Sequence, residues 1–124
     1  MEQLKDKIKT LSQKYHQEII DIRRHIHQNP ELAFEENKTA AFVSQKLTDY
    51  GIEHKTGIAK TGIVALIKGK KPHSYVVGLR ADMDALPILE ANTHDFISKN
   101  KGKMHACGQR CPHGFAAGGG ENPQ

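Results

Sequence analysis

Residues 75–87 read YVVGLRADMDALP, an apolar run that leads directly into two carboxylates, Asp82 and Asp84. Such a run is typical of a strand covered on both faces, and functional sites in α/β sheets lie beyond the carboxyl ends of strands. Residues 104–108 read MHACG and add an imidazole and a thiol. Because these side chains are ligands of hydrolytic metal ions, the two stretches together predict a metal site.

Two helices are predicted ahead of this stretch. Apolar residues recur at steps of three and four over residues 2–28, with charged residues on the opposite face. The same spacing predicts a second helix over residues 35–50, with Gly51 as its C-cap. We expect His25 and His27 to lie on the solvated surface of the first helix.

Strands are predicted after the helices. Residues 62–68 and 74–81 contain apolar, β-branched runs, and we expect these two runs to pair with each other across a turn. Residues 52–58 predict a weaker strand. Helices that lead into buried strands indicate an α/β domain.

The composition bounds the class of protein. A chain of 124 residues, 37% hydrophobic and 26% charged, fits one soluble domain or part of one. The net charge of +4 comes with scattered lysines, which does not indicate a nucleic-acid partner. The sequence contains no apolar run of about 18 residues, so it predicts no membrane span. The charged N-terminus is unlike a secretory signal. Two cysteines do not make a disulfide framework, so we expect a cytoplasmic protein.

Each pair of candidate ligands also has a simpler interpretation. Asp82 and Asp84 would then be solvated carboxylates after a strand. His105 and Cys107 would be a surface histidine beside a buried structural cysteine. The acidic pair and the His/Cys pair together indicate a site more specifically than either pair does alone.

Two other classes of function stay open. His105, Cys107, Cys111 and His113 form an H-x-C-x3-C-x-H pattern that would suit a small closed zinc module, although common zinc modules space their ligand pairs differently. Alternatively, the apolar stripe of residues 1–28 would pair with a partner, in a non-catalytic helical interaction piece.

Four ordered motifs resemble a known enzyme family. They are residues 24–34, RHIHQNPELAF; residues 60–64, KTGIV; residues 79–88, LRADMDALPI; and residues 102–108, GKMHACG. Together they resemble the start of the metal-dependent amidohydrolases, which include hippurate hydrolase, N-acyl-amino-acid amidohydrolases, auxin-conjugate hydrolases and N-acetyldiaminopimelate deacetylase. This group is part of the wider aminoacylase and carboxypeptidase metallopeptidase family.

The resemblance implies a hydrolase that cleaves the amide bond of a small N-acyl amino acid or similar conjugate. Residues 1–108 would be the N-terminal part of an aminopeptidase-like α/β catalytic domain, and a lid domain would come later. The site would hold two divalent metal ions: zinc, manganese, cobalt or nickel. Cys107 is expected to be a metal ligand and Asp84 a catalytic residue that orients the site. A glutamate base would come from later sequence, and a homo-oligomeric parent is compatible with the family.

The sequence departs from the family pattern after Gly108. The family continues with His-Asp-x-His, whereas Gln109 and Arg110 stand at the first two of these positions. If one base is dropped from the codon of Gln109, permitted codon choices let the chain from Gly108 read GHDVHTASLLGAAKIL, the family's own continuation. We therefore interpret residues 109–124 as an irregular, frameshifted tail that ends at a premature stop. We expect the chain as given to be inactive.

Overall fold

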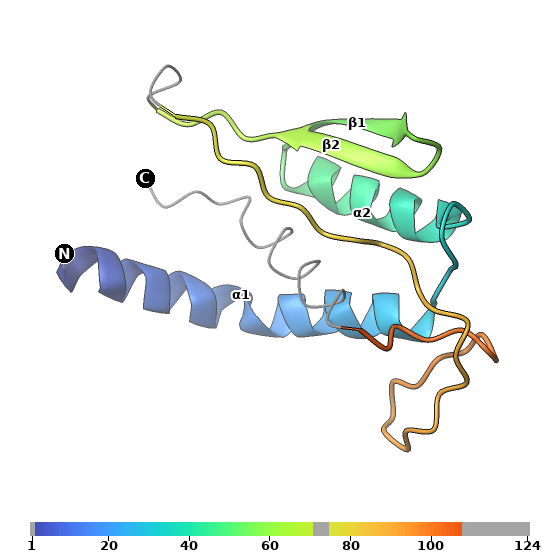
Figure 1. The fold of residues 1–124 in the computed structure, drawn as a ribbon. Helices are drawn as coiled ribbons and strands as arrows, with labels where there is room; N and C mark the ends of the chain where they lie inside the picture. Colours follow the sequence, from blue (N-terminus) through green and yellow to red (C-terminus); the bar gives the residue numbers. More distant parts are fainter. Residues whose placement is uncertain (1, 71–74, 108–124) are drawn as a thin grey trace.

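The computed structural model describes residues 2–70 and 75–107 of the chain. Its secondary structure consists of two helices followed by two antiparallel strands: α1 (Glu2–Gln28), α2 (Asn37–Asp49), β1 (Glu53–Ile58) and β2 (Gly62–Leu66). Figure 1 shows the hairpin of β1 and β2 packed along α2, with the extended residues 75–85 running between this layer and α1. No helix in the described residues is long and apolar enough to cross a membrane.

The structure confirms the two predicted helices and the weaker predicted strand. The helix expected over residues 2–28 is α1, the helix expected over residues 35–50 is α2, and the strand expected over residues 52–58 is β1. The fold class, helices followed by strands in an α/β fragment, is also confirmed. The predicted tail over residues 109–124 lies outside the described residues.

Helix α1 is buried only near its C-terminal end. Ile22 and Ile26 lie in the core, whereas Leu4 and Ile8, in the same apolar stripe, are 49% and 50% exposed. The N-terminal half of the helix projects beyond the other elements (Figure 1). Burial of apolar surface therefore fixes α1 to the rest of the chain through its last turns, where the first of the four motifs begins.

Glu31, just after α1, fixes the start of α2. Its carboxylate accepts hydrogen bonds from the backbone N–H of Lys38 (3.2 Å), from the N–H of Thr39 (2.7 Å) and from the Thr39 hydroxyl (2.8 Å). The N–H groups of the first helical turn have no partners within the helix, and negative charge there suits the helix dipole. Because Thr39 is buried, water is a poor substitute for this carboxylate.

The prediction that residues 62–68 pair with residues 74–81 is wrong. Strand β2 pairs instead with β1, and Ile58 lies opposite Gly62. Only residues 59–61 connect the two strands, and two of these residues have a positive φ that lets the chain reverse direction. This pairing closes a shorter loop than the predicted one, so it costs less chain entropy.

The run that was expected to be a buried strand is extended but carries no strand within the described residues. Residue 74 is not described, and Tyr75, Val76 and Val77 are 93%, 92% and 81% exposed. A strand covered on both faces requires neighbouring elements on each side. The described part of the chain does not supply them, so the apolar side chains of this run form an open face.

Replacing Gly62 by Ala should destabilise the hairpin. An added Cβ would lie 2.6 Å from the backbone oxygen of Ile58, so the strands would have to move apart. We expect a loss of roughly 1–3 kcal/mol, measured by thermal unfolding followed by circular dichroism. Gly78→Ala is the matched control, because a Cβ there meets no atom within 4 Å. Equal effects of the two substitutions would contradict this role for Gly62.

Glu90 fastens the loop that follows residues 84–87 (DALP, the DALP motif) to α1. Its side chain is 5% exposed, and its Oε1 lies 2.8 Å from Nε2 of His27 and accepts a 2.8 Å hydrogen bond from Nδ2 of Asn92. Its Oε2 accepts a 2.6 Å hydrogen bond from the N–H of Ser98. Burial by itself would raise the pKa of Glu90, but the hydrogen bonds outweigh burial and lower the pKa to about 2.

Glu90→Gln should weaken the fold and change its response to acid. A carboxyl whose folded pKa is lowered stabilises the folded state above its ordinary pKa of 4.5, and this contribution disappears as the pH falls to about 2. The substitution removes charge-assisted hydrogen bonds, so we expect a loss of roughly 2 kcal/mol at neutral pH. The dependence of stability on pH between these two values should become flatter.

The measurement is the urea midpoint of unfolding at a series of pH values. Glu53→Gln is the control, because the ion pair of Glu53 with Lys68 has both side chains 70% exposed and contributes little. If Glu90→Gln keeps the wild-type pH dependence, Glu90 does not hold this loop as described.

Candidate functional site

Backbone hydrogen bonds bring three of the sequence motifs together. The N–H of Ala85 donates to the carbonyl of Glu31 at 2.7 Å, and Leu32 and Ala85 form a parallel bridge. On its other side, Leu86 exchanges two hydrogen bonds of 2.9 and 3.0 Å with Met104 in an antiparallel bridge. Three stretches that are far apart in the sequence therefore lie side by side: residues 29–32 (NPEL), 84–87 (DALP) and 104–107 (MHAC).

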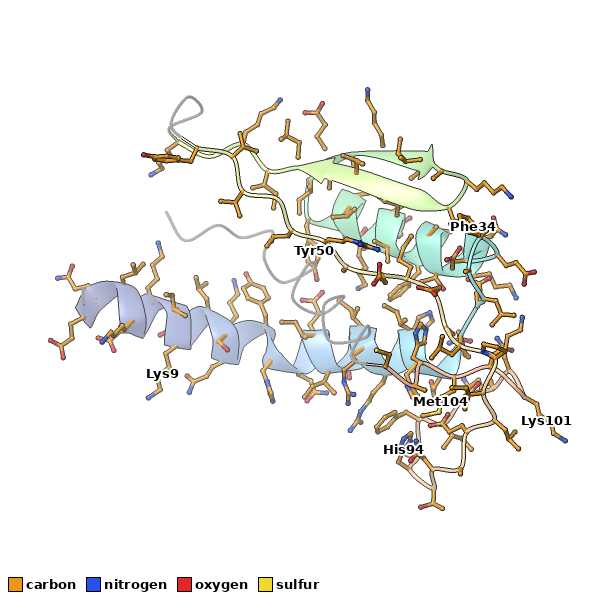
Figure 2. All side chains as sticks on the ribbon, in the orientation of Figure 1. Lys9, Phe34, Tyr50, His94, Lys101 and Met104 are labelled. Atoms are coloured by element: carbon orange, nitrogen blue, oxygen red, sulfur yellow. The ribbon has the colours of Figure 1, made fainter. Side chains whose placement is uncertain are left out.

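Two further hydrogen bonds hold the loop that precedes Met104. The side-chain amide of Asn100 donates to the carbonyl of Pro30, and the N–H of Lys99 donates to the carbonyl of Gln28, both at 2.9 Å. Figure 2 shows Met104 at the end of the molecule where α1 finishes. The DALP and MHAC motifs are thus held against the same end of α1.

The two carboxylates of the DMD sequence belong to half-buried residues but have different neighbours. Asp84 is half-buried and immediately precedes Ala85, which is 3% exposed. Asp82 accepts a 2.8 Å hydrogen bond from Arg80, and their side chains are 41% and 89% exposed. A surface ion pair of this kind contributes little. Asp84 therefore lies next to the joined motifs, and Asp82 fits the simpler interpretation of a solvated carboxylate.

His105 and Cys107 have environments opposite to those of their simpler interpretation. The imidazole of His105 is fully buried, and the thiol of Cys107 is exposed and free of any disulfide. His105 directly follows Met104, which pairs with Leu86, so its buried ring supports the loop there. The exposed thiol of Cys107, in contrast, can reach a metal ion or a ligand. Cys111 and His113 lie outside the described residues, so the four-ligand zinc pattern stays a prediction.

The described residues supply only part of the expected two-metal centre. Cys107 and Asp84 offer a thiol and a carboxyl, which are donors of the right kind. In the described part of the chain, the group of three possible ligand atoms within 4.8 Å of one another is His27, Glu90 and His94, which includes neither of them. The donors fit a divalent metal, but this part of the chain does not assemble a complete ligand set for two.

The sequence did not indicate that His27 belongs to the interior. We expected it on the solvated surface of α1, but it is fully buried and lies against Glu90. It directly follows Ile26, so it falls outside a simple apolar stripe, and helical periodicity could not find it. Its position inside the RHIHQNPELAF motif was the available signal.

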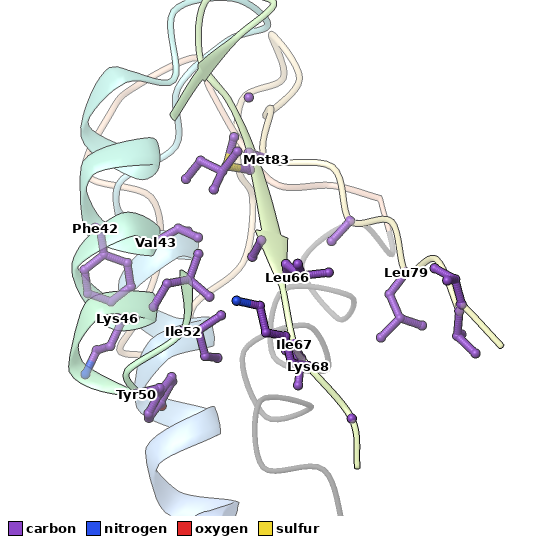
Figure 3. Close-up of a pocket in the computed structure, with 18 of the residues that line it drawn as sticks. Phe42, Val43, Lys46, Tyr50, Ile52, Leu66, Ile67, Lys68, Leu79 and Met83 are labelled. Carbon is purple, nitrogen blue, oxygen red and sulfur yellow. The ribbon is translucent and has the colours of Figure 1, made fainter. Parts of the chain in front are cut away.

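An apolar pocket of about 720 Å³ lies apart from these side chains. It opens between α2, β2 and the extended residues 75–83 (Figure 3). The side chains that characterise its lining are Phe42, Val43, Ile52, Leu66, Leu79 and Met83. Among the described residues, no carboxylate, histidine or cysteine lines the pocket, so this part of the chain forms an uncovered piece of the apolar core there rather than a catalytic site.

Known proteins match this chain in sequence and in structure. The sequence profile of peptidase family M20/M25/M40 matches residues 78–121. The N-acyl-L-amino acid amidohydrolase of Geobacillus stearothermophilus is 48% identical over 104 residues, which cover 84% of this chain and 28% of that protein. The hippurate hydrolase of Campylobacter jejuni is 49% identical over 87 residues, which cover 70% of this chain and 22% of that protein.

A solved structure has the same fold. The crystal structure of the Bacillus subtilis YXEP protein, a dinuclear metal-binding peptidase from the M20 family, matches with a TM-score of 0.73 and 38% identity. The match covers 86% of this chain and 29% of that one. Curated relatives are similarly longer, and this chain spans from 18% to 28% of their length. The chain is therefore similar, in sequence and in fold, to part of the catalytic domain of the M20 family of peptidases and amidohydrolases.

Proposed function

We propose that this chain is part of a metal-dependent hydrolase that cleaves the amide bond of N-acyl amino acids or similar small conjugates. The observation that carries the proposal is the pairing of Leu86 with Met104, because it gathers Asp84 and Cys107 at one end of the fragment. The names of the relatives support the substrate class, since they include an N-acyl-L-amino acid amidohydrolase and a hippurate hydrolase. We expect a cytoplasmic enzyme with a small-molecule substrate.

Cys107 is the proposed metal ligand, and Asp84 is the proposed orienting residue. The thiol of Cys107 is exposed, so it can bind a metal ion that also takes ligands from later sequence. Asp84 is half-buried beside a backbone that is fixed on both sides, so its carboxylate can hold a neighbouring ligand in orientation. Two divalent ions, of zinc, manganese, cobalt or nickel, would polarise the amide carbonyl and activate water.

We further propose that residues 109–124 are translated outside the family's reading frame. Gln109 and Arg110 stand where the family has His and Asp, and glutamine is a poor substitute for imidazole as a zinc ligand. The support comes from the sequence alone, because these residues are not described. The family profile match continues to residue 121, so similarity by itself does not decide the frame.

Sequencing the encoding DNA around the codon of Gly108 should show one base fewer than the family's frame requires. The purified 124-residue chain should not hydrolyse N-acetyl or N-benzoyl amino acids with added zinc, manganese or cobalt, because it lacks a ligand and the glutamate base. Restoring the frame and the downstream sequence should produce metal-dependent hydrolysis. An unshifted frame in the DNA would refute the frame proposal, and turnover by the 124-residue chain itself would show that the site is misassigned.

In the frame-restored enzyme, Cys107→Ala should reduce kcat/KM at least about a hundredfold, because a metal ligand is lost. Asp84→Asn should reduce kcat by roughly tenfold to a hundredfold while the enzyme still binds metal. Asp82→Asn is the matched control. It removes the same charge, two residues away from Asp84, from a carboxylate that forms only a surface ion pair with Arg80. Metal content would be measured alongside the rates. An enzyme indifferent to Cys107→Ala would show that the site is misassigned.

A further inference from the structure

We propose that His27, Glu90 and His94 form a binding site for one divalent ion of the zinc or cobalt type, separate from the two-metal centre expected around Cys107. Oε1 of Glu90 lies 2.8 Å from Nε2 of His27 and 3.4 Å from Nε2 of His94. The three ligand atoms all lie within 4.8 Å of one another. Two imidazoles and a carboxylate are a known ligand set for zinc, with a fourth position left to water.

The distances suit a metal ion after a small adjustment. Tetrahedral zinc with bonds of about 2.0–2.1 Å places its ligand atoms about 3.3 Å apart. The His94–Glu90 separation of 3.4 Å already has this value, whereas the His27–Glu90 separation of 2.8 Å is that of a hydrogen bond. A bound ion would therefore replace the shared proton between His27 and Glu90, and their ligand atoms would move apart by about half an ångström.

The surroundings hold the ligands and leave His94 partly open to solvent. The N–H of Ser98 fixes Oε2 of Glu90, so Oε1 faces the two histidines. The ring of His94 stacks on Phe96 with centroids 3.8 Å apart, which fixes its orientation. His27 and Glu90 are 0% and 5% exposed, but His94 is 30% exposed, so an ion can enter along its side.

A hydrogen bond to Glu90 and nearby positive charge both oppose binding of a metal ion. The side-chain amide of Asn92 would have to release its hydrogen bond to Oε1 of Glu90, which is feasible because Asn92 is exposed. The guanidinium groups of Arg24 and Arg23 lie 4.7 and 5.4 Å from the centre of the Phe96 ring and add positive charge. Affinity must therefore come from direct ligand bonds rather than from the surrounding field. Binding would join the end of α1 to the loop around Glu90 and stabilise both.

The test uses the 124-residue chain, stripped of metal with a chelator and titrated with cobalt chloride. The double variant Cys107→Ser/Cys111→Ser removes both thiols, so cobalt bound by it must have other ligands. We expect this variant to bind one equivalent of cobalt, with visible ligand-field bands but no thiolate charge-transfer band, and to unfold at a higher temperature when loaded. Adding His94→Ala should weaken binding at least about tenfold.

His16→Ala is the matched control, because His16 is an exposed histidine of α1 and should leave affinity unchanged. Circular dichroism would check that His94→Ala stays folded, and Glu90→Gln provides a second way to remove one ligand. Loss of cobalt binding with the two thiols, absence of binding in every variant, or unchanged affinity after His94→Ala would each overturn the proposal. None of these results would affect the amidohydrolase proposal, which depends on Cys107 and Asp84.

Discussion

The rest of the structure depends on how the backbone of Ala85 and Leu86 is held. Ala85 donates to Glu31 on one side, and Leu86 exchanges two hydrogen bonds with Met104 on the other. Each of these bonds joins main-chain groups, which every residue except proline offers in full. These main-chain hydrogen bonds therefore fix where the neighbouring side chains lie, and they form whatever those side chains are. This is how the two proposed site residues, Asp84 and Cys107, come to one end of the fragment from separate loops.

Two glutamates carry this constraint into the rest of the fold. Glu31 gives its carbonyl to Ala85 while its carboxylate caps α2, so one residue couples the motif region to the direction of that helix. Glu36, 7% exposed, accepts a 2.7 Å hydrogen bond from Thr61 in the hairpin connection. Buried carboxylates are costly unless they are hydrogen-bonded, and here the bonds themselves fix the layers relative to one another. The helix and the hairpin are consequently placed by polar contacts as well as by apolar packing.

The sequence predicted what local patterns can determine. The helices follow from a three-to-four residue spacing, which needs no partner to be recognised, and both were found within two residues of their observed bounds. The predicted pairing partner of β2 was wrong, because apolar runs identify strands but do not show which strands pair. The burial of His27 and its contact with Glu90 were missed because the two residues are 63 positions apart in the sequence. Asp84 and Cys107 were identified by motif, and their roles remain proposals.

The apolar run at residues 75–77 shows how a sequence can have the pattern of a buried strand and yet be exposed. Tyr75, Val76 and Val77 have the composition of a buried strand, and each large apolar side chain left in water forgoes roughly 1.5–3 kcal/mol of burial energy. Their exposure, together with the open pocket beside them, indicates that the pattern suits a larger sheet than the described residues build. Relatives of which this chain spans 18–28% contain further sequence outside the matched part. The hydrophobic pattern of a segment thus indicates the complete domain in which that segment would be buried. A change of reading frame after Gly108 would leave the pattern of the residues before it intact.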